Sequence, residues 1–285
     1  MNKGFSALIF LLLIPVILGI LFFALKDYSP LGEDSFAVDI YNWAKEDLGA
    51  TQKKVSSNVS WEFGQDTKTW QAIGTPPVCP EPFVFPSPVD INLATSILYP
   101  GQERGGDYKA HGGFRFDNLP NNEVNVYAPF DASVVAAARH TQGSDIQYVL
   151  YFTNNCGMAY KLDHLRELTS KFQKIMEDIP LAGDTDTRST GVTPPVFVAK
   201  GELIATKVGM ESTKNVFFDF GVYDFRQRNS ADYSGRNYYN IEQYGMHAIC
   251  WLENLEESTK TVALSLPGAD GQNGKKSDYC REAIH

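Results

Sequence analysis

A series of short apolar segments, each bounded by turn-forming residues, is the feature that most restricts how this chain can fold. The segments are EVNVYAPF, ASVVAAARH, IQYVLYFTN and NVFFDFGVYDF. Their β-branched and aromatic side chains favour strands, and Gly, Asn, Asp or Pro residues bound them. Between them, HLRELTSKFQKIMEDI has helical periodicity and AGDTDTRSTGVTPP is typical of a polar loop. The pattern predicts a mainly β domain with a few helices over residues 91–226.

The segment HGGFRFD predicts a strand with one apolar and one polar face. Successive side chains of a strand point to opposite faces of its sheet. Phe114 and Phe116 therefore share the face that suits a core. The other face carries a polar set: His111, Gly113, Arg115 and Asp117. We expect this polar set to line a groove or to face solvent.

Asp219 is a carboxylate inside the strongly hydrophobic segment NVFFDFGVYD. In a strand it shares one face with Phe217 and Gly221, and the opposite face is apolar. The residues of that apolar face are Val216, Phe218, Phe220 and Val222. A buried carboxylate is costly unless it is paired or bound to a cation. Asp219 is therefore a candidate site residue that needs a cationic partner.

His164 is the next-to-last residue of the segment MAYKLDHL, which alternates like a strand. On that pattern His164 shares one side with Tyr160 and Leu162, and Lys161 and Asp163 point to the other side. The local sequence favours a simpler interpretation, in which His164 begins the following helix and Asp163 is its N-cap. His164 becomes a site candidate only in a wider context.

An uncharged apolar run from Phe5 to Leu25 is long enough to cross a hydrocarbon core of about 30 Å. It ends at Lys26 without a small-residue cleavage site, which favours an uncleaved anchor over residues 1–30. Lys3 is the only charge before the run, so the N-terminus is expected in the cytoplasm. The sequence thus predicts a single-pass protein of the cell membrane with an extracytoplasmic C-terminal domain.

The segment KGFSALIF also resembles the processing site of type IV prepilins, where cleavage would follow Gly4. Ile9 stands where those proteins usually carry a glutamate. A pilin-like structural surface protein therefore stays open as an alternative, and an intact N-terminus by mass spectrometry would exclude it.

The remaining regions flank the predicted β domain. Residues 31–90 combine one predicted helix, DSFAVDIYNWAKEDLG, with a proline-rich stretch that excludes a helix or a central strand. Residues 227–285 form a turn-rich extension. The chain carries a net charge of −9 and has no long basic run, so nucleic-acid binding has no electrostatic support.

The four cysteines fit an extracytoplasmic setting, where an even number can form disulfides. Three pairings are possible. We favour Cys250 with Cys280, which would tie down the C-terminal extension and leave Cys79 with Cys156. Buried free thiols remain the alternative.

Five motifs occur in an order that resembles the M23 (LytM-type) zinc peptidase domain. They are HGGFRFD, VYAPFDASVVAAA, YKLDHL, VFVAKGELIATKVG and VFFDFGVYD, over roughly residues 99–225. The resemblance implies a barrel-sandwich fold of the duplicated hybrid motif type, with a groove on the site face. It covers about half of the chain and supports the fold more than the activity.

The resemblance implies a degenerate metal site. His111 matches the first zinc ligand of the family, and His164 matches one of its two catalytic histidines. Arg115 stands in place of the ligand aspartate, and Asp219 replaces the last ligand histidine. Phe217 replaces the other catalytic histidine.

Arginine carries only donors and a permanent positive charge, so it cannot bind zinc and repels it. The leading hypothesis is an ion pair between Arg115 and Asp219 that takes the place of the metal. The residues flanking this pair would be His111, His164 and Asp117. The domain would then hold no cofactor and be non-catalytic, binding or regulating an envelope polymer or an envelope protein.

The alternative retains a metal, because zinc accepts aspartate oxygen as well as histidine nitrogen. His111, His164 and Asp219 would then form a two-histidine, one-carboxylate site of a kind that iron also uses. Asp117 would supply a fourth ligand or a base. This alternative requires Arg115 to turn away, and it predicts an active metallopeptidase of the cell-wall endopeptidase type that loses activity on His111→Ala.

Overall fold

The structure is a computed structural model, and it describes residues 59–236, 240–271 and 277–280. These residues belong to one unit, Ser57–His285. The expected membrane anchor (1–30) and the helix expected directly after it (34–49) lie outside the described residues. No helix within those ranges has the length and apolar character needed to cross a bilayer.

The fold is mainly β, as the sequence predicts. The strands are β1 (Ser60–Gly64), β2 (Thr69–Ile73), β3 (Ser96–Leu98), β4 (Gln102–Arg104), β5 (Asp107–Lys109), β6 (Gly112–Arg115), β7 (Glu123–Tyr127), β8 (Ala132–Gln142), β9 (Asp145–Thr153), β10 (Met158–Leu168), β11 (Leu181–Asp184), β12 (Thr190–Val198), β13 (Leu203–Val208) and β14 (Phe217–Asp224). The helices are η1 (Ile91–Leu93), α3 (Ser170–Glu177), η2 (Gly245–His247), η3 (Trp251–Asn254) and α4 (Glu257–Ser265).

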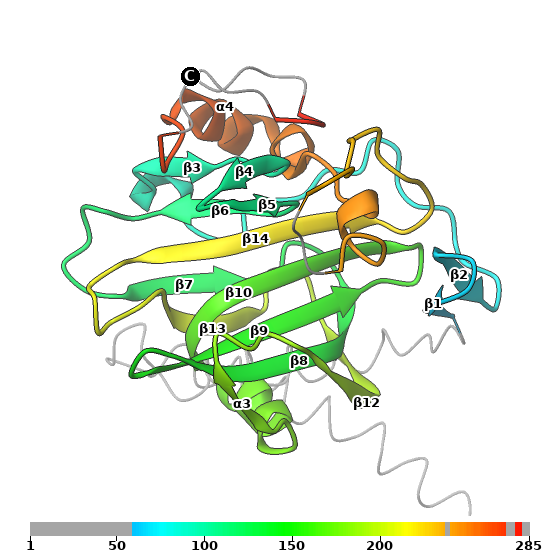
Figure 1. The fold of residues 1–285 in the computed structure, drawn as a ribbon, viewed down its shortest axis with the longest axis horizontal. Helices are drawn as coiled ribbons and strands as arrows, with labels where there is room; N and C mark the ends of the chain where they lie inside the picture. Colours follow the sequence, from blue (N-terminus) through cyan, green and yellow to red (C-terminus); the bar gives the residue numbers. More distant parts are fainter. Residues whose placement is uncertain (1–58, 237–239, 272–276, 281–285) are drawn as a thin grey trace, which may run out of the picture. The chain divides into compact units, whose positions relative to one another are not determined.

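Ten strands form the main sheet, and its central path runs β11-β8-β9-β10-β14-β6-β3. Figure 1 shows β14 in yellow across the middle, with β6 and β3 on one side and β10, β9 and β8 on the other. β12 pairs with β8, and β13 pairs with both β10 and β7. Strands from distant parts of the sequence therefore meet at β14, which is antiparallel to both β6 and β10.

The larger of two apolar clusters packs on one face of this sheet. The alternation predicted for β6 and β14 is observed, because Phe114, Phe116, Phe218 and Phe220 are all fully buried. Phe172 of α3 packs into the same core. The opposite face of β14 carries Asp219 and, further along the strand, Tyr223, which packs in a second, smaller apolar cluster with Val149 and Ala159.

Two local predictions are wrong. The residues expected to begin a helix at His164 continue β10 to Leu168, and α3 covers only Ser170–Glu177. The expected polar loop contains β11 and most of β12, which both pair with β8. Pairing with the long β8 strand supplies the backbone partners that the local sequence does not indicate. The β1–β2 hairpin is a further element that the sequence does not predict.

Both disulfides form as the sequence favoured, Cys79–Cys156 and Cys250–Cys280, and no free cysteine is present among the described residues. The second bond lies within the C-terminal extension and ties Cys280 to the start of η3. The indole of Trp251 is buried against Phe114 and Phe220, with ring centroids 5.0 and 5.2 Å apart. The extension therefore completes the core of the β domain.

Candidate functional site

Asp219 occupies the centre of the polar face, between two strands. It lies opposite Gly113 of β6 and opposite Asp163 of β10. A Cβ atom at position 113 would lie 2.2 Å from the Phe218 carbonyl oxygen and 3.1 Å from Asp219 Oδ1. Only glycine leaves room for the carboxylate at this point of the sheet.

His111 approaches Asp219 from the residue before β6. Its Nε2 lies 2.9 Å from Asp219 Oδ2, and both side chains are buried. A Cβ atom at Gly221 would come within 3.0 Å of the His111 Cβ, so this glycine makes space for the imidazole. His111 and Asp219, which are far apart in sequence, therefore form one buried pair.

His164 reaches the same carboxylate because β10 contains a β-bulge. The pairing register with β9 shifts between Leu162 and Leu165, and His164 has a φ of 61°. Both leucines are buried, so the two residues between them point to the polar face. His164 Nε2 lies 3.7 Å from Asp219 Oδ2. Bulges often re-aim side chains next to functional sites.

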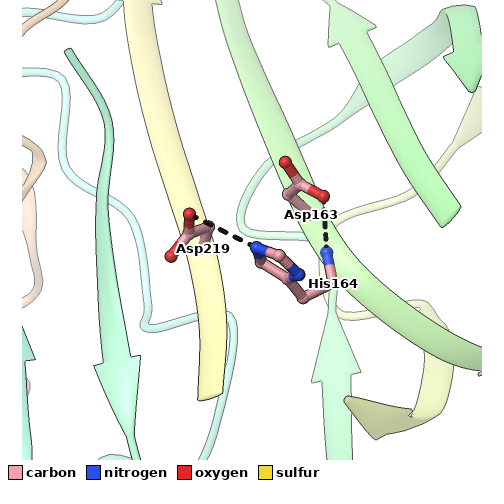
Figure 2. A group of neighbouring side chains, drawn as sticks. All are labelled: Asp163, His164 and Asp219. Atoms are coloured by element: carbon pink, nitrogen blue, oxygen red, sulfur yellow. Dashed lines mark hydrogen bonds and ion pairs between the residues drawn. The ribbon is translucent and has the colours of Figure 1, made fainter. Parts of the chain in front are cut away.

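Figure 2 shows the resulting cluster of Asp163, His164 and Asp219. One potential ligand atom from each of the three lies within 4.8 Å of the others. Asp163 Oδ1 accepts a hydrogen bond from the His164 backbone N–H at 2.7 Å. Its Oδ2 lies 2.7 Å from the Lys161 ammonium. Asp163 thus links the bulge to a buried cation.

Two cations surround the carboxylates. Lys161 pairs with Asp163, and both are buried. Arg104 of β4 is also buried and donates to the carbonyl oxygens of Tyr99 and His111 at 2.8 and 3.2 Å. The two carboxylates, Asp163 and Asp219, are therefore matched in number by one lysine and one arginine.

The protonation states follow from burial and from these charges. Burial, aided by Lys161, lowers the pKa of His111 to about 4, against the opposing attraction of Asp219. Burial alone would raise the pKa of Asp219, but His111, His164 and Arg104 hold it well below its usual range. At neutral pH, His111 is neutral and Asp219 is ionised, the states in which both bind metal ions.

A cavity of about 470 Å³ adjoins this cluster. His111, His164 and Asp219 line it together with Lys161, Asp163 and His140. The cluster is therefore open to a ligand on one side, although its side chains are buried.

The ion pair expected between Arg115 and Asp219 is not found. The guanidinium instead bonds Asn215 at 2.9 Å, Asp117 at 3.2 Å and Asp270 at 3.2 Å. The polar contacts of Asp219 within the described residues are both with histidines. Arg115 lies opposite Phe217 in the sheet, two residue pairs away from Asp219, and its side chain turns toward Asp270 of the C-terminal extension.

Asp117 also lies apart from the cluster. Its side chain is half exposed, and it accepts a hydrogen bond from Thr95 Oγ1 at 2.9 Å as well as the bonds from Arg115. The expected role of Asp117 as a metal ligand or flanking residue therefore has no geometric support. The turned-away Arg115 meets the condition that the two-histidine, one-carboxylate site requires.

We predict that Arg115→Ala leaves the metal content of the protein unchanged and lowers stability by only about 1 kcal/mol, because the ion pairs that Arg115 makes are partly exposed to solvent. Elemental analysis and urea unfolding of the variant check both statements. A large change in the metal content of Arg115→Ala would show that Arg115 does take part in the site.

Asp163 of the cluster and the two cations beside it do not stand out in the sequence as site residues. For Asp163, the local sequence indicates only a helix N-cap. The bulge at His164 depends on the pairing of β10 with β9 and β14, which the local sequence does not show. Lys161 alternates with Asp163 on one face, which is a weak signal for a buried ion pair. Arg104 lies on a separate hairpin and carries no signal in the sequence.

Comparison of the chain with protein-family models, with curated proteins and with solved structures gives no match.

Proposed function

We propose that the chain is a membrane-anchored, extracytoplasmic M23-like domain that binds one divalent metal ion and hydrolyses peptide bonds in the cell envelope. One observation carries the metal site: His111 Nε2 and His164 Nε2 both approach Asp219 Oδ2, at 2.9 and 3.7 Å. The order of the sequence motifs suggests the reaction class. The apolar run from Phe5 to Leu25 would hold the domain at the membrane.

The donor set suits zinc, which accepts imidazole nitrogen and carboxylate oxygen. His111, His164 and Asp219 would hold the ion. Asp219 Oδ1 and His111 Nδ1 are buried and have no hydrogen-bond partner among the described residues. A buried polar atom without a partner is costly. A nearby cation or an ordered water would supply the missing interaction for Asp219 Oδ1.

When bound, the metal supplies a Lewis acid and a water of lowered pKa. The residues of the chain prepare the site for it. Burial keeps the pKa of His111 low, so its imidazole remains neutral. Its Nε2–H donates to Asp219, and this hydrogen would move to the unpartnered Nδ1 to free Nε2 for the ion. Asp163 orients the bulge through the His164 N–H, and Lys161 balances the charge of Asp163.

A second candidate function is non-catalytic binding of an envelope polymer or protein, without a metal. The charges of Lys161 and Arg104 favour it, because they already match the two carboxylates. In this role these two cations, rather than Arg115, would stand in for the metal.

Metal analysis separates the two candidates. We expect the full-length chain, stripped with a chelator and titrated with zinc, to bind one equivalent per chain. Elemental analysis after removal of free zinc gives the stoichiometry, and calorimetry gives the affinity. No binding above the level of a His111→Ala/Asp219→Ala double variant would favour the non-catalytic function instead.

A further inference from the structure

Gln147 of β9 contacts both His164 and the loop before β14. The side chain is completely buried. Its Oε1 lies 2.6 Å from His164 Nδ1, and its Nε2 lies 2.9 Å from the Gly209 carbonyl oxygen. A fully buried amide that uses both ends in this way has one orientation.

The orientation follows from hydrogen-bond chemistry. The Gly209 carbonyl can only accept, so the amide group facing it must be the NH₂ group. The other end, which faces His164 Nδ1, is then the carbonyl oxygen of Gln147. Because this oxygen can only accept, Nδ1 of His164 must carry the hydrogen.

The Gly209 peptide is itself fixed. Its N–H donates to the His164 backbone oxygen at 2.8 Å, so it contacts the same bulge that Gln147 contacts. Gly209 has a φ of +76°, and a Cβ atom there would lie 2.3 Å from the Asn215 carbonyl oxygen. Glycine is therefore required at this position. The Gly209 carbonyl belongs to the peptide whose Met210 N–H donates to the Asn215 carbonyl oxygen at 2.8 Å, and this bond holds the carbonyl toward Gln147.

The loop that follows Gly209 has a separate anchor. Asp145 accepts hydrogen bonds from the backbone N–H and the hydroxyl of Ser212, at 3.1 and 2.7 Å. Arg166 pairs with the other oxygen of Asp145 at 3.2 Å. These contacts hold the loop without touching the Gln147 amide or the imidazole.

We propose that Gln147 is a positioning residue that holds the His164 proton on Nδ1, so that the lone pair of neutral Nε2 faces Asp219. The Nε2 atom lies 3.7 Å from Asp219 Oδ2. In metal sites, the hydrogen bond made by the second ring nitrogen fixes the tautomer and the ring orientation of a histidine ligand. The role in metal binding rests on the proposed function, but the tautomer does not.

The tautomer is measurable in the metal-free, full-length chain labelled with ¹⁵N-histidine, at about two pH units above the ordinary histidine pKa. We expect His164, assigned by its loss in His164→Gln, to show a protonated Nδ1 and an unprotonated Nε2. Gln147→Met removes both amide contacts and is expected to move the proton to Nε2 partly or fully. Gln147→Glu keeps an acceptor for Nδ1 and is expected to retain the tautomer.

Zinc titration of the same proteins adds a second measurement. We expect Gln147→Met to weaken zinc binding by about tenfold to a hundredfold, as for other residues that orient a ligand. Ser212→Ala is the matched control, because it loosens the same loop and leaves the amide in place. It is expected to change neither the tautomer nor the affinity.

Three results would overturn the role of Gln147: a protonated Nε2 in the wild-type chain, an unchanged tautomer in Gln147→Met, or an equal shift in Ser212→Ala. A failure of the proposed function is distinct from these. If the tautomer responds as expected and the wild-type chain binds no zinc, Gln147 still positions His164, and the metal site is wrong.

Discussion

Replacing Asp219 by alanine is expected to abolish zinc binding by the full-length chain. Asp219 Oδ2 is the oxygen that both His111 Nε2 and His164 Nε2 approach, so its removal takes away the centre of the donor set. Loss of a ligand costs more than the roughly tenfold to hundredfold change seen when an orienting residue is lost. Calorimetric titration and elemental analysis of the stripped protein give the result.

Asp219→Asn separates loss of the ligand from loss of the fold. The amide keeps the volume and an oxygen acceptor for His111, but it has no negative charge. We expect it to fold, by circular dichroism, and to bind zinc at least about a hundredfold more weakly than the wild type. Asp117→Asn is the matched control, because Asp117 lies apart from the cluster with Arg115 and Thr95. Wild-type affinity in Asp219→Ala would contradict the proposed site.

Strand alternation anticipates that His111 and Asp219 lie on polar strand faces, but the leading hypothesis paired Asp219 with Arg115 and not with His111. Both residues occupy the polar face of strands whose other face is aromatic, and alternation alone assigns those faces. The glycines between and beside them, Gly113 and Gly221, admit the side chains. The strand period of two is a strong signal, and here it placed the buried carboxylate correctly.

The partners of Arg115 could not be anticipated. Asp270 belongs to the C-terminal extension, 155 residues away in sequence, and Asn215 lies in the loop before β14. The extension lies beside β3, the strand next to β6 at the end of the main sheet, and the Ala269 N–H donates to the Ile97 carbonyl of β3 at 2.8 Å. Arg115 therefore connects β6 to the extension, and its contacts depend on how distant segments pack rather than on local pattern.

The bulge at His164 marks the limit of what local sequence predicts. The bulge between Leu162 and Leu165 arises from the way β10 pairs with β9. No glycine marks it in the sequence, although His164 adopts a positive φ. Such backbone is strained for a residue with a side chain and persists where the surroundings enforce it. The Gly209 N–H and Gln147, which both contact His164, supply part of that enforcement.

Acid is expected to destabilise the metal-free chain, with His111 contributing about 3 kcal/mol between pH 6.5 and pH 4. Burial lowers the pKa of His111 from its ordinary value of 6.5 to about 4 in the folded protein. Between these values the unfolded chain binds a proton and the folded chain does not, so the free energy of unfolding falls as the pH falls. Below pH 4 both states are protonated, and the contribution of His111 to the slope ends.

His111→Gln isolates this effect, because glutamine can still donate to Asp219 and does not titrate. Urea unfolding of the chelated protein across the same pH range is expected to show a shallower loss of stability in the variant, by about 3 kcal/mol in total. His140 and His247 also have pKa values lowered by burial, so the variant keeps part of the slope. Asp163 and Asp219 have depressed pKa values and contribute stability that is lost only at lower pH, outside this window. Identical slopes in the variant and the wild type would mean that His111 is protonated in the folded chain, and the cluster would then be a charged ion pair rather than a neutral ligand beside a carboxylate.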